Sequence, residues 1–132
     1  MARSVERYAV YWVDLDPVRG KEIAKNRPAL VVSDDAMNRT LSTVVVCPVT
    51  SRLHPRWPSR VRTTIAGREA EIAVDQIRTI DRSRLGERVD AIEEAAAAEV
   101  RHMNTLMYGV LSVHARARSG KARLFASVRH CA

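Results

Sequence analysis

Basic and hydroxyl side chains stand at the ends of two apolar runs of the chain. Arg27 lies just before the run 29–32, and Thr50 and Ser51 directly follow the run 43–49. A guanidinium donates two parallel hydrogen bonds to a phosphate and keeps its charge at any working pH. A hydroxyl can hold a further phosphate oxygen. Together these residue types favour an anion site.

The two ends can meet only if the runs form neighbouring antiparallel strands, because the start of one strand then lies beside the end of the other. Arg52 follows Ser51, and Glu22 and Lys25 lie in the preceding loop, where a carboxylate can accept a proton. Such a set can bind a phosphodiester or cleave it. In RNA the ribose 2′-hydroxyl serves as the nucleophile, so a protein need only position it, move protons and stabilise charge.

Short segments rich in β-branched and aromatic residues predict a mainly β protein with helices. The expected strands are 8–15, 29–33, 43–49, 61–65, 71–74 and 77–80. A short helix is expected after Asp81, and a longer one is expected to open at Asp90 with Glu93 in a capping box. Its apolar stripe is expected to run through Ile92, Ala96, Val100, Met103, Met107 and Val110. The pattern predicts a small, partly closed antiparallel barrel with a C-terminal helix.

Composition sets limits on the class of protein. The 132 residues are 46% apolar and 28% charged, typical of one globular domain, and carry a net charge of +7. Residues 112–132 hold five basic residues and no acid, which leaves a net charge of +2 in 1–111. We therefore expect a domain at 1–111 and a basic C-terminal extension at 112–132. Without an export signal or a membrane span, a cytoplasmic location is expected.

Several kinds of site are not suggested by the sequence. The four histidines are scattered without ligand spacing, and no nucleotide-binding glycine motif or nucleophile elbow occurs. We expect no metal and no cofactor. Cys47, inside an apolar run, is expected to be a small buried residue, and no disulfide with Cys131 is expected.

Three blocks stand in order between about residues 10 and 85: VYWVDLDPVRGKEIAKNRPALVVSDDAMN, TVVVCPVTSR and EIAVDQIRTIDRSRL. Together they resemble the MazF/PemK-type toxin endoribonucleases, and RPALVV followed by PVTS is the most specific part. The resemblance implies an SH3-like antiparallel barrel that acts as a homodimer. It also implies cofactor-free, metal-independent cleavage of single-stranded RNA at short sequences, giving 2′,3′-cyclic phosphate and 5′-hydroxyl ends, and neutralisation by a cognate antitoxin.

The resemblance also assigns roles by position. The family's arginine before proline falls on Arg27, which is expected to stabilise the phosphorane and to share in proton transfer. Its threonine after the third strand falls on Thr50, expected to grip the phosphate, and Glu22 is expected to be the general base. The residues expected to contact RNA are Lys25, Ser51, Arg52 and Gln76.

Two departures and two alternatives remain. Members usually carry Gly-Asp before the first strand, where this chain has Tyr8-Ala9, and the basic extension lies beyond the usual domain end.

A non-enzymatic, gyrase-binding toxin of the CcdB type shares the expected barrel, so the fold alone does not establish cleavage. A nucleic-acid-binding barrel is the other alternative. Trp57 is available as a stacking platform for an unpaired base.

Overall fold

The structure is a computed structural model that describes residues 4–15, 19–20, 22 and 26–109. Contacts divide the chain into two compact units, residues 1–100 and 101–132. The strands are β1 (Ala9–Asp14), β2 (Asn26–Val31), β3 (Thr43–Thr50), β4 (Arg60–Ile65), β5 (Arg68–Ala73), β6 (Arg78–Asp81) and β7 (Leu85–Ala91). The helices are α1 (Asp35–Thr40), η1 (Val74–Gln76), η2 (Arg82–Arg84) and α2 (Glu94–Tyr108). Among the described residues, no helix has the length and apolar content needed to span a membrane.

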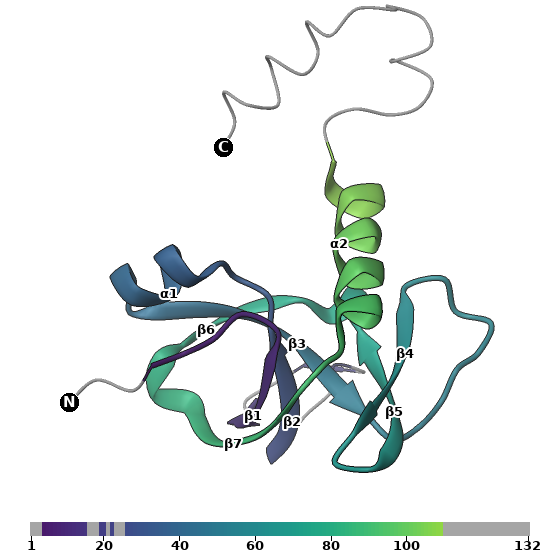
Figure 1. Cartoon of the computed structure of the whole chain (residues 1–132), viewed down its shortest axis with the longest axis horizontal. Coiled ribbons are helices and arrows are strands. Elements are labelled where there is room, and N and C mark those ends of the chain that lie inside the picture. Colours follow the sequence, from purple (N-terminus) through teal and green to yellow (C-terminus); the bar gives the residue numbers. More distant parts are fainter. Residues whose placement is uncertain (1–3, 16–18, 21, 23–25, 110–132) are drawn as a thin grey trace, which may run out of the picture. The chain divides into compact units, whose positions relative to one another are not determined.

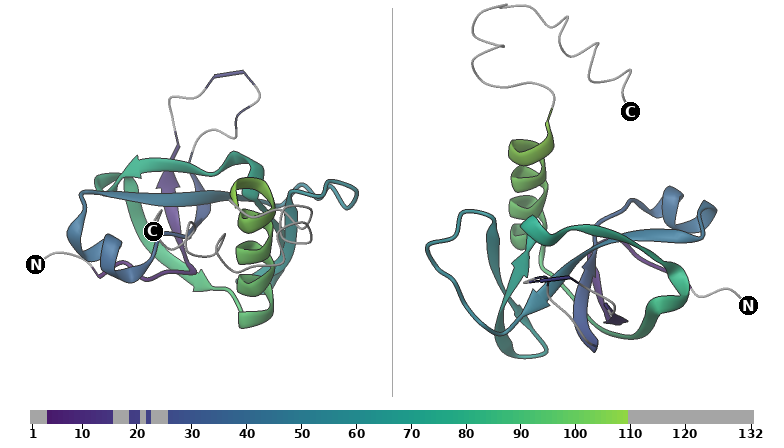
Figure 2. Two further views of the ribbon diagram at one scale, coloured as in Figure 1. Left: turned by 90° about the horizontal axis from the view of Figure 1, so that it is seen from above. Right: turned by 180° about the vertical axis from the view of Figure 1, so that it is seen from behind.

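The strands form one curled antiparallel sheet in the order β4-β5-β3-β2-β1-β7, with β6 paired to β3 (Figure 1). The curl is visible in both views of Figure 2. A cluster of buried side chains fills its interior: Val5, Ala9, Tyr11, Val13, Leu15, Ala29, Val31, Val44, Val46, Ile80 and Leu85. The expected half-closed antiparallel sheet with a C-terminal helix is confirmed.

Strand β3 is the strand on which the others assemble. One of its edges pairs with β2, and its other edge pairs first with β6 and then with β5. Its side chains alternate between the two faces of the sheet. Six of its eight residues are apolar or proline, and six of the eight are buried. Cys47 lies on the face opposite Val46 and is fully buried, which confirms the expectation for this residue and raises the pKa of its thiol to about 12.

Two prolines mark where the pairing of β3 ends. The Val32 N–H donates to the Val45 carbonyl at 2.9 Å. Hydrogen-bonded pairs recur every two residues along an antiparallel ladder, so the pair after that of Leu30 would include Pro28. Pro28 has no N–H to donate. The ladder stops one residue earlier, at Ala29 with Pro48. On the other edge, Pro48 falls between the β6 pairing, which ends at Val46, and the β5 pairing, which begins at Val49.

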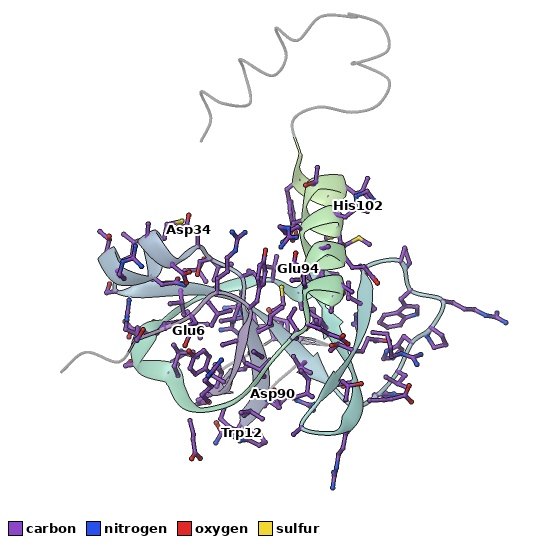
Figure 3. All side chains as sticks on the ribbon, viewed as in Figure 1. Glu6, Trp12, Asp34, Asp90, Glu94 and His102 are labelled. Carbon is purple, nitrogen blue, oxygen red and sulfur yellow. The ribbon has the colours of Figure 1, made fainter. Side chains whose placement is uncertain are left out.

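The C-terminal part differs from the expectation. Asp90 does not open the long helix but lies in β7, which pairs with β1 (Figure 3). Its carboxylate accepts hydrogen bonds from the main-chain N–H groups of Ala66 and Ala91. The helix α2 begins at Glu94. Three of the seven residues of β7 are charged, and they conceal its strand character. A strand at a sheet edge can carry such residues because it needs few apolar side chains. Ala96 and Val100 of the expected stripe are buried, but Met107 is 37% exposed and is not core.

Backbone strain occurs at two non-glycine positions. Tyr8 has φ 68°, in the left-handed region, at the place where the resembled family usually carries glycine. The two-residue turn of the β4–β5 hairpin consists of Ala66 (φ 49°) and Gly67 (φ 79°), both left-handed. This is the geometry of a type I′ turn, for which Asn-Gly is the favoured sequence.

We predict that Ala66→Asn stabilises the protein by about 0.5–1 kcal/mol, because asparagine tolerates a left-handed backbone better than alanine does. Urea unfolding of the variant beside the wild type measures the change. Ala66→Val is the matched opposite, since a β-branched residue fits this region poorly and should destabilise the hairpin. Equal midpoints for all three proteins would contradict the argument.

Candidate functional site

Arg27 and Thr50 lie on one face of the sheet, at the ends of neighbouring strands. The β2–β3 register pairs Ala29 with Pro48, and paired residues direct their side chains to the same face. Arg27 is two residues before Ala29, and Thr50 is two residues after Pro48, so alternation places both on that face. The antiparallel neighbourhood expected from the sequence is confirmed. Arg27 is half-buried and Thr50 is buried.

A pocket of about 200 Å³ opens beside Pro48, at the gap between the β5 and β6 pairings. Its lining residues are Glu22, Pro48, Asp75, Gln76, Ile77 and Arg78. The sequence-predicted Glu22 and Gln76 therefore come together here from a loop and from η1. Lys25, also predicted, lies outside the described residues.

Arg78 is a further cation at this opening that the sequence analysis missed. It pairs with Val46, so it shares the face of Val46, Pro48 and Thr50, and its Nη1 donates to the Leu15 carbonyl at 3.0 Å. Its only sequence signal is its position in the QIRTID segment. Assigning it to the site requires the β3–β6 register, which one sequence does not supply.

The hydroxyl of Thr50 is oriented by the chain that follows it. Thr50 Oγ1 accepts a hydrogen bond from the Arg52 N–H at 3.1 Å. An oxygen that accepts in this way still carries its own proton, which is available to donate to an anion. Ser51 and Arg52 are both exposed.

Glu22 is held in its loop by local hydrogen bonds. Its carboxylate accepts from the Arg19 N–H, and its own N–H donates to the Arg19 carbonyl at 3.2 Å. The side chain is exposed and lines the pocket. The arrangement places a carboxylate at the opening where a proton acceptor was expected.

A buried carboxylate lies next to Thr50. Glu71 is the cross-strand partner of Thr50 on β5, and its side chain is only 2% exposed. Its oxygens accept from the His54 N–H at 2.6 Å and from Arg60 Nη1 at 3.0 Å, and His54 Nδ1 lies 3.1 Å away. Arg60 is 4% exposed and also donates from Nε to Asp75 at 2.8 Å. Sequence reasoning missed Glu71, because nothing in the REAEIA segment marks one glutamate as buried.

Both carboxylates in this network have lowered pKa values. Desolvation would raise the pKa of Glu71, but hydrogen bonds from His54 and Arg60 together outweigh it, and the pKa lies below its ordinary value of 4.5. Desolvation likewise opposes the lowering at Asp75, where hydrogen bonds from Arg60 and Ser59 prevail. The Asp75 carboxylate accepts these hydrogen bonds from Ser59 Oγ at 3.0 Å and from Arg60 Nε at 2.8 Å.

Within the described part of the chain, no group of three or more histidine, cysteine, aspartate or glutamate side chains is arranged to hold a metal ion.

The family model described as "PemK-like, MazF-like toxin of type II toxin-antitoxin system" matches residues 6–105. The chain belongs to this PemK/MazF toxin family. The match spans β1 to α2 and every described residue of the candidate site.

Two relatives agree with the family. The chain is 29% identical over 123 residues to Endoribonuclease MazF of Staphylococcus saprophyticus, which covers 89% of this chain and 99% of that protein. It is 34% identical over 95 residues to Endoribonuclease EndoA of Bacillus subtilis, which covers 68% of this chain and 82% of that protein.

Solved structures of MazF share the fold. MazF of Deinococcus radiodurans (Form-I) superposes with a TM-score of 0.73 and 30% identity, over 83% of this chain and 100% of that one. A MazE-MazF structure from the same organism (Form-II) gives a TM-score of 0.68 and 31% identity, again over 83% of this chain and 100% of that one. The PemK/MazF half-barrel with its C-terminal helix is thus the architecture of this protein.

We predict that Glu71→Ala lowers the free energy of unfolding by about 3 kcal/mol or more, because removing one partner leaves the other charge buried and under-compensated. The matched control is Glu69→Ala on the same strand, which removes an exposed pair with Arg62 at 3.3 Å and should cost under about 1 kcal/mol. Chemical denaturation measures both values. Similar losses in the two variants would show that the Glu71 network contributes little.

The same network gives a pH dependence of definite sign. A carboxylate with a lowered pKa in the folded state contributes stability above its ordinary pKa and loses it as the pH falls through the folded value. Stability should therefore decline on acidification from about pH 5, and Glu71→Gln should flatten that decline.

Proposed function

We propose that this protein is a sequence-specific endoribonuclease toxin that cleaves single-stranded RNA without a metal ion and is neutralised by a cognate antitoxin. The observation that carries the proposal is the placement of Arg27 and Thr50 on one face, beside a pocket lined by Glu22 and Gln76. Membership of the toxin family and two relatives named endoribonucleases support the reaction class.

The proposed reaction is an internal transfer that conserves all atoms. The ribose 2′-oxygen attacks the adjacent phosphorus as a base removes its proton, and a new P–O2′ bond forms. The P–O5′ bond breaks, and the leaving oxygen takes up a proton. The products are a 2′,3′-cyclic phosphate and a 5′-hydroxyl, so no water or external nucleophile enters this step.

Each proposed role follows from side-chain chemistry. Arg27 stabilises the negative charge that accumulates on the phosphorane oxygens, because a half-buried residue acts in a less polar setting than water. Arg27 also shares in proton transfer. Thr50 donates its hydroxyl proton to a phosphate oxygen, since its oxygen is already held by the Arg52 N–H. Glu22 is the general base for the 2′-hydroxyl.

Binding of the RNA on either side of the scissile group falls to neighbouring residues. Ser51 and Arg52 are exposed directly after Thr50, where they can contact phosphates, and Gln76 at the pocket can read a base edge. Lys25 is proposed as a further phosphate contact from the loop before β2. Arg78 adds positive charge on the same face.

Two partners complete the proposal. A toxin of a type II system has a cognate antitoxin, and a similar MazF has been solved with MazE. An antitoxin segment that covers Arg27 and the pocket would block RNA. The protein is further proposed to act as a homodimer.

We predict that Arg27→Ala lowers the cleavage rate by about 10²–10³-fold while the protein still folds, because one preorganised oxyanion donor is lost. The assay incubates purified protein with a long single-stranded RNA in EDTA and maps the new 5′ ends. Arg62→Ala, which removes an arginine whose side chain is 45% exposed, is the matched control and should cut normally. An unchanged rate in Arg27→Ala would remove the assignment.

The wild-type protein tests the class of function in the same assay. Discrete cuts with 5′-hydroxyl ends in EDTA are expected. Intact RNA together with inhibition of gyrase would instead favour the CcdB-type toxin.

We predict that Thr50→Val lowers the cleavage rate by about 10-fold or more, whereas Thr50→Ser retains most of it, because only the hydroxyl is needed at the phosphate. The two variants are compared by single-turnover rates on the same RNA, with thermal melting as the folding control. If valine cuts as fast as serine, the hydroxyl has no role in the reaction.

A further inference from the structure

The loop that joins β3 to β4, residues 51–59, is basic and carries an exposed aromatic ring. In Figure 1 this β3–β4 loop projects beside β4. With Arg60 its sequence reads SRLHPRWPSR, which contains three arginines and no acid. Trp57 is 48% exposed although it is one of the largest apolar side chains. Neither the candidate site nor the family's expected residues account for it.

One face of the Trp57 indole is covered and the other is open. The His54 ring stacks on the indole at 3.9 Å between centroids, and the Arg60 guanidinium lies 4.5 Å from it. If the His54 ring and the Arg60 guanidinium lay on opposite faces of the indole, they would be about 8 Å apart. Arg60 Nη1 is only 3.3 Å from His54 Nδ1, so both lie on the same face. The exposure of the indole then belongs largely to its other face.

The covered face rests on a rigid support. His54 and Arg60 are both hydrogen-bonded to the buried carboxylate of Glu71, and Arg60 is bonded to Asp75 as well. The main-chain N–H of Trp57 donates to the main-chain carbonyl of His54 at 3.0 Å, which closes the turn that carries the ring. An aromatic ring fixed in this way loses little conformational entropy when a ligand binds to it.

The Trp57 ring is connected to Thr50, the residue proposed to hold the phosphate. Glu71, which supports the ring, is the cross-strand partner of Thr50, and paired Cα atoms in an antiparallel ladder lie only about 4.5–5.5 Å apart. Asp75, at the other end of the network, lines the pocket with Gln76. The indole, Thr50 and the pocket are thus linked through one set of contacts.

We propose that the open face of Trp57 stacks on an unpaired base of the RNA substrate, flanking the phosphate held at Thr50. The inference rests on the proposed function and adds to it a base-binding subsite outside the expected residues. Single-stranded RNA is the occupant that fits, because it offers a flat π face together with negative charge for the arginines of the loop. Stacking on a ring accepts every base, so the subsite contributes affinity and register, while edge contacts at the pocket read sequence.

The binding test uses the Trp12→Phe protein, in which Trp57 is the only tryptophan of the chain. The probe is a 2′-O-methyl RNA 12-mer of randomised sequence, which cannot supply the attacking hydroxyl. Titration should quench the indole fluorescence, and Trp57→Ala in the otherwise native chain should bind the probe about 5- to 100-fold more weakly by anisotropy. Trp57→Phe should stay within about 3-fold of wild type because it keeps an aromatic face.

The control is Leu41→Ala, which removes a side chain of similar exposure (44%) outside the β3–β4 loop and should leave binding unchanged. Thermal melting checks that each variant folds, and the fluorescence titration needs no Trp57 substitution. An unquenched indole in a protein that binds the probe, or equal affinities for Trp57→Ala and wild type, would overturn the inference. A Trp57→Ala protein that binds the RNA probe normally but binds the antitoxin more weakly would also overturn the inference.

Cleavage assays separate this inference from the proposed function. In Trp57→Ala, KM for a long single-stranded RNA should rise while kcat changes little, because the ring touches no reacting atom. If the wild-type protein cuts RNA and Trp57→Ala matches it in KM and in cut sites, the subsite is wrong and the nuclease function stands. If the wild-type protein cuts no RNA, the proposed function itself fails.

Discussion

The architecture depends on how the main-chain donors of β3 are used. This strand has partners along both edges and buried side chains on both faces, so its course sets the position of β2, β5 and β6. Pairing stops where a residue has no N–H to offer, at Pro28 on one edge and at Pro48 on the other. The opening beside Pro48 is where the pocket forms, and Arg27 and Thr50 flank the end of the ladder.

A second constraint is electrostatic. Burial of the Glu71 carboxylate has a high desolvation cost, and it is offset only because His54 and Arg60 surround it with donors. These donors come from the β3–β4 loop and the first residue of β4, so the loop is tied to β5. Arg60 extends the tie to Asp75 and thereby to η1. A polar network of this kind fixes a loop more firmly than apolar contacts alone would, since each bond has a preferred direction.

Local patterns predicted much of the fold, and register explains what they missed. Runs of β-branched residues correctly indicated β1 to β6, and Cys47 inside such a run was correctly expected to be buried. Strand β7 was missed because LGERVDA carries the charges of a helix start and little apolar alternation. Arg78 and Glu71 join the site only through pairing with β3, which depends on contacts distant in sequence. The roles of Arg27, Thr50 and Glu22 remain predictions.

The gap at Pro48 has a consequence for how such a toxin is controlled. The Pro48 nitrogen is a tertiary amide that carries no hydrogen. The opening beside it therefore belongs to the folded sheet, and no change in strand pairing can supply the missing hydrogen bond. Under the proposed function, an antitoxin that blocks this opening has to cover it from outside.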